Sequence, residues 1–355
     1  MRTTKNKFFP FSPIKSIVLV FLAAAIVFAA VVAKQPQATV RLHDDQIEVQ
    51  QLTNAIAEYI LEKGYNYKVE RVESTIKEIR THLINGDIDL TLELWLENNL
   101  VWYQNSMDQG IIKDLGKLYS GGKQYWIVSR WYADSHNIRT IFDMKNHWQD
   151  FLDPDDPSKG IFFNCIYGWT CRDINKVKLH AYGLDRYYNT VSPVSPESLK
   201  SIYRNAGKMR IPVFGYYWEP NSIMLTDNWK ILEEPPYSRE IWKKVITSAE
   251  DPSATTLQQA CAYNDTGAHK VASRNFYKKH PELIEMFSKM TINMDHFNAI
   301  FLRNNKEKRT PSSFRNFALE YLESHPDQWR SWVPGEIADR IEKNLIKDGH
   351  TATGD

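Results

Sequence analysis

The chain has 355 residues, an apolar fraction of 43% and a formal net charge of +1. This length suggests about two domains of ordinary size, each with enough apolar residues for a core. The near-neutral charge argues against a nucleic-acid-binding protein, which would normally carry a strong basic excess or a basic stripe.

The N-terminal segment, residues 1–33, has the features of an export signal. A basic leader without acidic residues precedes an unbroken apolar run at 17–33, which ends in Val31-Val32-Ala33, a suitable cleavage site. The run is slightly shorter than the ~20 residues of a membrane span, so a cleaved signal peptide is favoured over an uncleaved signal-anchor. Both place residues 34 onward outside the cytoplasm, and we expect a periplasmic protein, membrane-anchored only if residues 17–33 are retained.

The first elements of the mature chain alternate between strand and helix. A short strand is expected at 39–42, a helix with apolar spacings of three and four over 52–60, and a strand at 67–72. Thr75 with Glu78 forms a capping box for the next helix. Apolar residues at alternate positions over 88–94 then indicate another strand. This β-α-β-α-β order predicts an α/β fold with a mostly parallel sheet.

The second half of the chain continues the α/β pattern. Further strands are expected at 125–129, 160–163 and 211–217. The Asp- and Pro-rich stretch at 153–157 predicts a surface loop. Helices are expected at 172–182, 196–205, 281–290 and 328–345.

Cys165 and Cys171 are close in sequence, and in an oxidising compartment such a pair is a disulfide candidate. Zinc is the alternative, but no His lies at ligand spacing nearby, so no metal site is expected. A loop this small would contribute about 2 kcal/mol and would mainly fix the segment that carries Trp169. Cys261 is expected to be a buried free thiol.

Three tryptophans follow the predicted strands. Trp95 ends the strand at 88–94, Trp169 follows the strand at 160–163, and Trp218 ends the strand at 211–217. Ligands of open α/β sheets bind at the carboxyl ends of strands. Each tryptophan alone could be an ordinary core or interface residue, but three such positions together favour a binding site.

The residues after Trp169 predict an anion site beside an aromatic ring. Thr170 and Asp173 have capping-box spacing, so a helix is expected to begin there. Its first backbone N–H groups, at 170–172, would be unpaired and would suit a carboxylate. Aromatic faces suit a quaternary ammonium, at up to ~2 kcal/mol for each desolvated contact. Together they would match a zwitterion such as glycine betaine, although an ordinary capped helix with a packed tryptophan is the alternative.

On these residues the chain resembles the glycine betaine-binding proteins of osmoprotectant ABC importers. The resemblance covers most of residues 39–300, and it is carried by GDIDLTLELWLEN (86–98), FFNCIYGWTC (162–171) and VFGYYWEP (213–220), with a weaker match at 276–301. It implies a two-lobed, type II-like periplasmic-binding-protein fold with a hinge, closing on its ligand and docking to a permease. It also implies a substrate cage of Trp95, Trp169 and Trp218, carboxylate binding by the Thr170 and Cys171 amides, and a Cys165–Cys171 disulfide.

Three positions depart from that pattern or extend it. Asn99 stands where relatives often have a carboxylate-assisting His, and it can still donate. Glu219 follows Trp218, where a neutral residue is expected; it could favour choline, or it could be a solvated rim residue. His43, together with Asp44, sits at a strand end and could face the cleft. In the alternative, Asp44 or Asp45 caps the next helix.

The resemblance divides the chain into segments of two lobes. We expect lobe I at 34–126, lobe II at 127–220, a return to lobe I at 221–302 and a C-terminal helical extension at 303–355.

A transport receptor is the favoured function: the solute-binding component of an ABC importer, binding glycine betaine or a related quaternary-ammonium osmolyte, without a cofactor. Choline or carnitine is the alternative ligand for the same fold, and a membrane-tethered sensory domain is a further alternative. The sequence has no G-x-S-x-G, H-E-x-x-H or P-loop motif. A hydrolase or lyase acting on choline-like compounds would have to use Glu219 with His43.

Overall fold

The computed structural model describes residues 38–254, 256–303 and 311–352. The predicted export segment at 1–33 therefore lies outside the described residues. Within the described ranges, no helix is long and apolar enough to cross a membrane. The described residues from Val40 onward form one compact unit, which holds both sheets and the helices that cover them.

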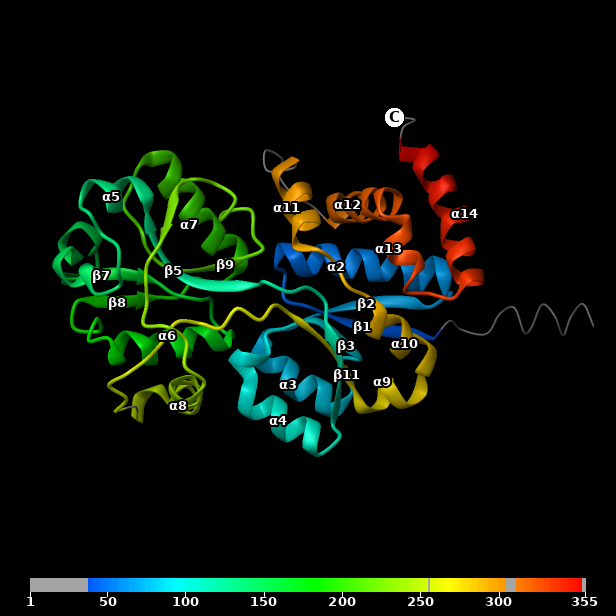
Figure 1. The fold of residues 1–355 in the computed structure, drawn as a ribbon, viewed down its shortest axis with the longest axis horizontal. Helices are drawn as coiled ribbons and strands as arrows, with labels where there is room; N and C mark the ends of the chain where they lie inside the picture. The colour runs from blue at the N-terminus through cyan, green and yellow to red at the C-terminus, as the bar shows by residue number, and fades with distance from the viewer. Residues whose placement is uncertain (1–37, 255, 304–310, 353–355) are drawn as a thin grey trace, which may run out of the picture. The chain divides into compact units, whose positions relative to one another are not determined.

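Five strands form the first sheet, in the order β2 (Lys68–Glu73), β1 (Thr39–Asp44), β3 (Leu90–Leu94), β11 (His269–Ser273) and β4 (Ile112–Lys117). Every residue of β3 is buried, because helices cover both faces of the sheet. Figure 1 shows α2 (Glu48–Tyr59) on one side and, on the other, α3 (Ile76–Asn85) and α4 (Leu100–Asp108).

The second sheet has the order β10 (Trp229–Ile231), β5 (Lys123–Ser129), β9 (Phe214–Glu219), β7 (Asp156–Phe163) and β6 (Leu152–Asp153), and β8 (Tyr188–Val191) also pairs with β7. Its core is aromatic, with Trp126, Phe162 and Phe214 all fully buried. Figure 1 shows α7 (Pro196–Met209) on one side of this sheet and, on the other, α6 (Thr170–Ala181) and α8 (Arg239–Ala249).

Both sheets are mixed: the parallel arrangement expected of the first strands holds for β1, β3 and β4, and antiparallel strands complete each sheet. Strands β1 and β3 are parallel, but β11 runs antiparallel to both β3 and β4. In the second sheet β7 is parallel to β8 and β9, whereas β5 is antiparallel to β9 and β10. Strands β5 and β11 each follow a crossing between the sheets and run antiparallel to their neighbours, and local sequence does not show their direction.

Local sequence patterns succeed for most helix ends and fail at two places. The predicted capping box of Thr75 and Glu78 forms, and Gly86 ends that helix in the left-handed region at φ 78°. The helix expected at 328–345 is two helices, α13 (Pro326–Arg330) and α14 (Gly335–Ala352), because Pro334 cannot continue a helix. The stretch at 153–157 is the turn between antiparallel strands β6 and β7 rather than a plain surface loop.

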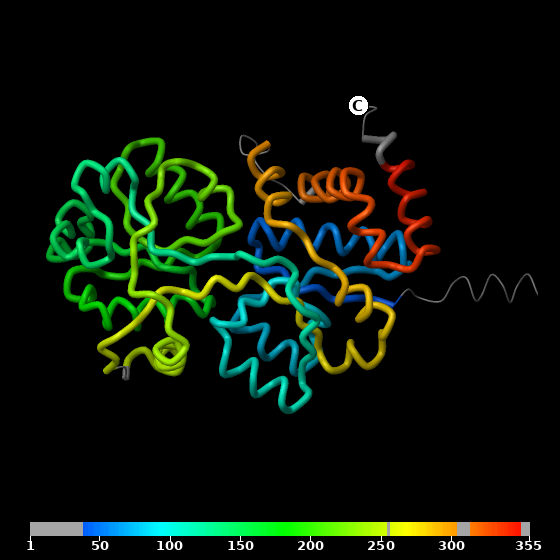
Figure 2. Tube along the Cα trace, viewed as in Figure 1, coloured from blue at the N-terminus to red at the C-terminus, as the bar shows by residue number. Residues whose placement is uncertain are grey.

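The backbone crosses between the sheets twice, at 118–122 and at 232–268, and the two connections run side by side (Figure 2). The Leu118 amide donates to the Ala268 carbonyl over 2.9 Å. A Cβ on Gly122 would lie 2.8 Å from the Gly267 Cα, so this approach requires glycine. Strand β10 pairs with β5 beyond the expected boundary at 220, and we propose that the lobes divide within these two connections.

The C-terminal helices pack against the first lobe. Helix α12 (Pro311–Ser324) contacts α2, and α14 contacts the π-helical turn η1 (Ile60–Gly64). A Cβ on Gly64 would come within 2.9 Å of Ile337 and Ile341, so this packing is close. The remaining helices are α5 (Arg130–Ser135), α9 (Arg274–Lys279), α10 (Pro281–Lys289) and α11 (Met294–Arg303), with 3-10 turns η2 (Leu96–Asn99), η3 (Asp143–Asn146), η4 (Trp148–Phe151) and η5 (Pro252–Ala254).

Candidate ligand-binding pocket

One pocket is lined by side chains from both sheets and their following segments. The lining residues are Asp45, Ile47, Ile76, Glu93, Trp95, Asn98, Asn99, Gln124, Trp169, Thr170, Cys171, Tyr216 and Trp218. The structure thus brings together six residues that the sequence analysis selected: Trp95, Asn99, Trp169, Thr170, Cys171 and Trp218. Two others selected there, His43 and Glu219, do not line it.

Three indole rings from separate elements line this pocket. Trp169 and Trp218 meet edge to face, with ring centroids 5.1 Å apart and an interplanar angle of 79°. Trp218 also stacks on Tyr217, at 4.8 Å and 18°. Trp95 is half-buried, and its Nε1 donates to Glu93 Oε1 over 3.1 Å. These contacts hold the rings in fixed orientations around the cavity.

Helix α6 begins at Thr170, as predicted, but not with the predicted cap. Trp169 is the N-cap and its side chain makes no capping bond. The expected capping-box role of Asp173 is wrong, since Asp173 forms ion pairs with Lys77 and Arg172 instead. The Arg172 amide donates to the Trp169 carbonyl over 3.2 Å. The Thr170 and Cys171 amides are left at the start of the helix, where N–H groups have no intrahelical partner.

The expected disulfide joins Cys165 to Cys171, with the two Cα atoms 5.9 Å apart. Cys261 is a buried free cysteine, as predicted. Asn164 closes the same loop, because its Oδ1 accepts from the Cys165 amide over 2.7 Å and its Nδ2 donates to the Arg172 carbonyl over 2.9 Å. The loop that carries Trp169 is therefore held at both ends.

Asn99 lines the pocket with both ends of its amide already bonded to the protein. Its Nδ2 donates to the Trp95 carbonyl over 3.0 Å, and its Oδ1 accepts from Arg80 Nη2 over 2.9 Å. The neighbouring Asn98 exchanges hydrogen bonds with Gln124 of the second sheet, at 2.8 and 3.2 Å. Through Asn99 and Asn98, the segment that carries Trp95 is therefore bonded to Arg80 of α3 and to Gln124 of the second sheet.

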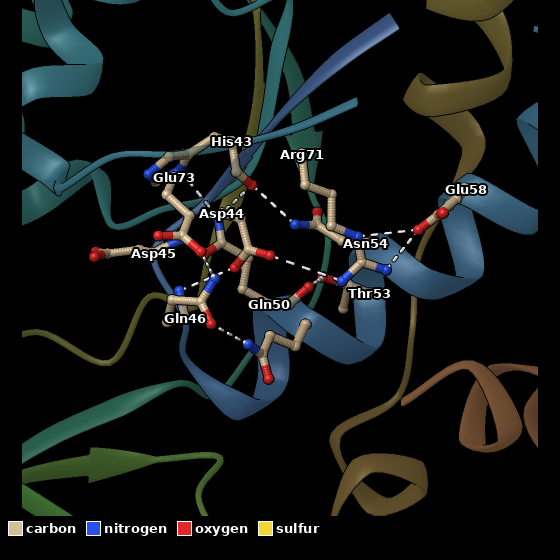
Figure 3. A network of polar contacts seen from close by, with 11 residues as sticks. His43, Asp44, Asp45, Gln46, Gln50, Thr53, Asn54, Glu58, Arg71 and Glu73 are labelled. Carbon is tan, nitrogen blue, oxygen red and sulfur yellow. Dashed lines mark hydrogen bonds and ion pairs between the residues drawn. The ribbon is translucent and has the colours of Figure 1, made fainter. Parts of the chain in front are cut away.

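His43 belongs to a buried polar network at the end of β1 (Figure 3). Its Nε2 donates to the Ser74 carbonyl over 2.8 Å, so Nδ1 is the acceptor for Thr91 Oγ1 and Gln50 Nε2, each 3.0 Å away. Burial lowers the pKa of His43 to about 4, so the imidazole is neutral at ordinary pH. His43 therefore joins neighbouring elements and does not face the pocket.

Glu219 is directed away from the pocket. It accepts a 2.7 Å hydrogen bond from the Tyr125 hydroxyl, and in the sheet it lies opposite Lys123. Glu219 is therefore a tyrosine-bonded residue on β9. It makes no contact with His43, so the acid–base pair that an enzyme would need is not assembled from these two residues.

The alternative in which Asp44 or Asp45 caps the next helix is also wrong. The N-cap of α2 is Ile47, without a side-chain bond. Asp44 Oδ1 accepts from the Gln46 amide over 2.9 Å. In Figure 3 the Asp45 side chain points away from this network, and it lines the pocket.

Two carboxyl groups that were not predicted from the sequence, those of Asp45 and Glu93, also line the pocket. Glu93 is fully buried, and its Oε1 accepts from Trp95 and from the Tyr119 hydroxyl. Burial raises the pKa of Glu93 to about 8, an effect that the Tyr119 and Trp95 hydrogen bonds only partly offset. Burial likewise raises the pKa of Asp45 well above its usual range, partly offset by the nearby Trp169 indole N–H. Alternation along β3 could have revealed Glu93, because residues two apart share a strand face and Trp95 is two residues away.

A family model described as the substrate-binding domain of an ABC-type glycine betaine transport system, the OpuAC family, matches residues 38–324. The chain belongs to the OpuAC family. It is thus a substrate-binding domain of an ABC transport system of the glycine betaine class. The proteins of this family are extracytoplasmic binding proteins. A comparison with curated protein sequences gives no significant match.

Solved structures with the same fold confirm the two-lobed architecture. One is a glycine betaine/L-proline-binding protein, ProX, from Borrelia burgdorferi, at TM-score 0.67 and 17% identity over 85% of this chain and 99% of that one. Another is an ABC-transporter choline-binding protein with choline bound, at TM-score 0.65 and 16% identity over 86% and 98%. A third is lactococcal OpuAC, closed on glycine betaine, at TM-score 0.63 and 15% identity over 84% and 100%.

Proposed function

We propose that this OpuAC-family chain captures a quaternary-ammonium osmolyte in the periplasm, between Trp95, Trp169 and Trp218, and delivers it to an ABC permease. The supporting observation is that these three indoles, from three different elements, line one pocket. A transport receptor requires ligand capture and release and no chemical step, which suits a pocket of aromatic rings and amides.

The proposed ligand follows from what the rings can bind. A trimethylammonium group has no N–H, so hydrogen bonds cannot hold it, whereas ring faces attract its diffuse charge and bury its methyl groups. Each desolvated contact contributes up to ~2 kcal/mol, so three could support micromolar affinity after the cost of association. The polar end of the ligand would lie at the start of α6, on the Thr170 and Cys171 amides.

We propose a supporting role for Asn99, since its amide is already bonded to the Trp95 carbonyl and to Arg80. It would fix the orientation of Trp95, and the ligand would be contacted by the indole itself.

Calorimetric titration of the chain from residue 34 onward with glycine betaine, proline betaine, choline and carnitine tests the proposal. We expect at least one of them to bind in the micromolar range, and Trp169→Ala to weaken that binding at least tenfold, about the free energy of one cation–π contact. Trp131→Ala is the matched control, because Trp131 lies at the start of α5, outside the pocket, with Arg210 over its ring at 5.3 Å.

Two results would contradict the proposal. One is the absence of binding by all four compounds, and the other is an unchanged affinity in Trp169→Ala. Proton NMR of the same mixtures detects turnover, and formation of a product would support the alternative of an enzyme acting on choline-like compounds.

A further inference from the structure

Two buried carboxyl groups from different elements line the proposed ligand pocket. Asp45 lies between β1 and α2, and Glu93 lies on β3. Glu93 is fully buried and Asp45 is 7% exposed. Among the described residues, neither Asp45 Oδ2 nor Glu93 Oε2 accepts a hydrogen bond, although the Trp169 indole N–H, itself without a partner, lies near Asp45. Buried polar atoms normally have partners, so these two acceptors are available to a ligand.

The residues lining the pocket include no Lys, Arg or His. Three basic side chains bonded to or adjacent to pocket residues are paired: Arg80 bonds to Asn99 and Glu250, and Lys77 and Arg172 pair with Asp173. The amides at the start of α6 are the positive feature of the lining. They carry only a partial charge, which does not neutralise two carboxylates.

The two carboxyl groups and the α6 amides can bind a ligand alcohol in more ways than a ligand carboxylate. A ligand hydroxyl can donate to Glu93 Oε2 or Asp45 Oδ2 and can accept from the Thr170 or Cys171 amide at the same time. A ligand carboxylate can use the amides only, and it adds negative charge to a low-dielectric cavity that already holds two acids. It would require at least one of those acids to remain protonated.

We infer that Asp45 and Glu93 make this pocket select a quaternary-ammonium cation with an alcohol terminus, an amino alcohol of the choline type, over a zwitterionic betaine. The inference rests on the proposed function, because it names the ligand class for the same aromatic pocket. Glu93 has a second role as a positioning residue, since its Oε1 holds the Trp95 indole N–H over 3.1 Å.

Calorimetry with choline chloride and glycine betaine at pH 8.5 tests this inference on the wild type, Glu93→Gln, Asp45→Asn and Glu219→Gln. We expect the wild type to bind choline at least tenfold more tightly than glycine betaine. Each pocket variant should weaken choline binding about tenfold or more and should leave betaine binding unchanged or tighter, because removing an acid removes repulsion. Glu219→Gln is the matched control, because Glu219 bonds to Tyr125 outside the pocket, and it should change neither affinity.

The outcomes separate the inference from the proposed function. Binding of betaine as tight as or tighter than that of choline by the wild type would overturn the inference and leave the quaternary-ammonium receptor standing. Equal losses for both ligands in Glu93→Gln and in Asp45→Asn would also overturn it, since they would indicate a merely structural role. Binding of neither ligand would overturn the inference, and the proposed function would fall with it only if proline betaine and carnitine also did not bind. Glu93→Gln can still accept from Trp95, and thermal unfolding verifies that each variant is folded.

Discussion

At the scale of single residues, the pocket combines features that sequence could predict with features that it could not. The three tryptophans were predictable because each lies at or after the end of a strand whose pattern is local. Glu219 was harder to place, since its position opposite Lys123 depends on the antiparallel pairing of β5 and β9. Asp45 was not predictable, because its direction depends on the turn after β1, where Gln46 adopts a left-handed φ of 61°.

The acid in β3 should make cation binding depend on pH. Because burial raises the pKa of Glu93 to about 8, the empty pocket holds a proton there at neutral pH, and a bound cation favours its release. The affinity for choline should therefore rise between about pH 6.5 and pH 9 and level off above the pKa of the free pocket. The groups that face Glu93 are Trp95, Tyr119 and the second acid, Asp45, and no basic group opposes this trend.

Calorimetry in two buffers of different ionisation enthalpy measures the proton released on binding at each pH. The Glu93→Gln variant should show a weaker pH dependence and less proton release. Proton uptake on choline binding by the wild type would contradict the assignment.

At the scale of elements, helix limits were predictable from caps and periodicity, whereas sheet order was not. Thr75 and Glu78 lie three residues apart, and their capping box forms as expected. Strand β11 enters the first sheet between β3 and β4 from more than a hundred residues away, and no local pattern encodes that place. In the loop at 164–169, the disulfide from Cys165 to Cys171 was predictable from the local sequence. The close contact of Gly168 with Thr75 was not, because Thr75 is distant in sequence.

The double variant Cys165→Ala/Cys171→Ala tests the disulfide in that loop. Its removal should lower the free energy of unfolding by about 2 kcal/mol in the chain-entropy model. It should also weaken ligand binding, because the Thr170 and Cys171 amides lose their fixed position. Urea denaturation measures the first effect. A reducing agent should reproduce both effects in the wild type and should have no effect on the double variant. A double variant as stable as the wild type would refute the prediction.

Gly168→Ala tests the contact between this loop and α3. Gly168 has φ 84°, and a Cβ there would come within 2.5 to 2.9 Å of Thr75. The Gly168 carbonyl also accepts from the Lys77 amide over 3.1 Å. We expect ligand affinity to fall at least tenfold in calorimetry, because the left-handed conformation and the clash together cost roughly 2 kcal/mol or more. Gly183→Ala is the control: φ is 66° there, but the nearest atom to a Cβ is the end of Lys145, 3.8 Å away.

At the scale of the whole described molecule, ion pairs join elements of the two lobes around the pocket. Lys77 of α3 pairs with Asp173 of α6, and Lys200 of α7 pairs with Glu48 of α2. The second pair is nearly buried, with side chains 9% and 11% exposed, so water screens it little. Proteins of this fold close by hinge motion, and we propose that these pairs favour the closed arrangement.

The double variant Glu48→Gln/Lys200→Met should therefore favour the open form. We expect ligand affinity to fall several-fold and the ligand-free radius of gyration from small-angle X-ray scattering to increase, because opening no longer separates a charge pair. Lys244→Ala is the control, since its pair with Glu240 lies within α8 and is exposed. An unchanged radius and affinity would show that this pair does not influence closure.

The place of β11 also has a consequence for the order of assembly. The strands of the second sheet all come from one continuous stretch, residues 123–231, so they can pair before the rest of the polypeptide is made. The first sheet lacks its fourth strand until residues 269–273 have been synthesised, and until then β3 and β4 have no bridge between them. A ribosome-bound intermediate ending before Lys270 would therefore hold one finished lobe and one open sheet, and truncation there should leave a chain unable to retain any solute.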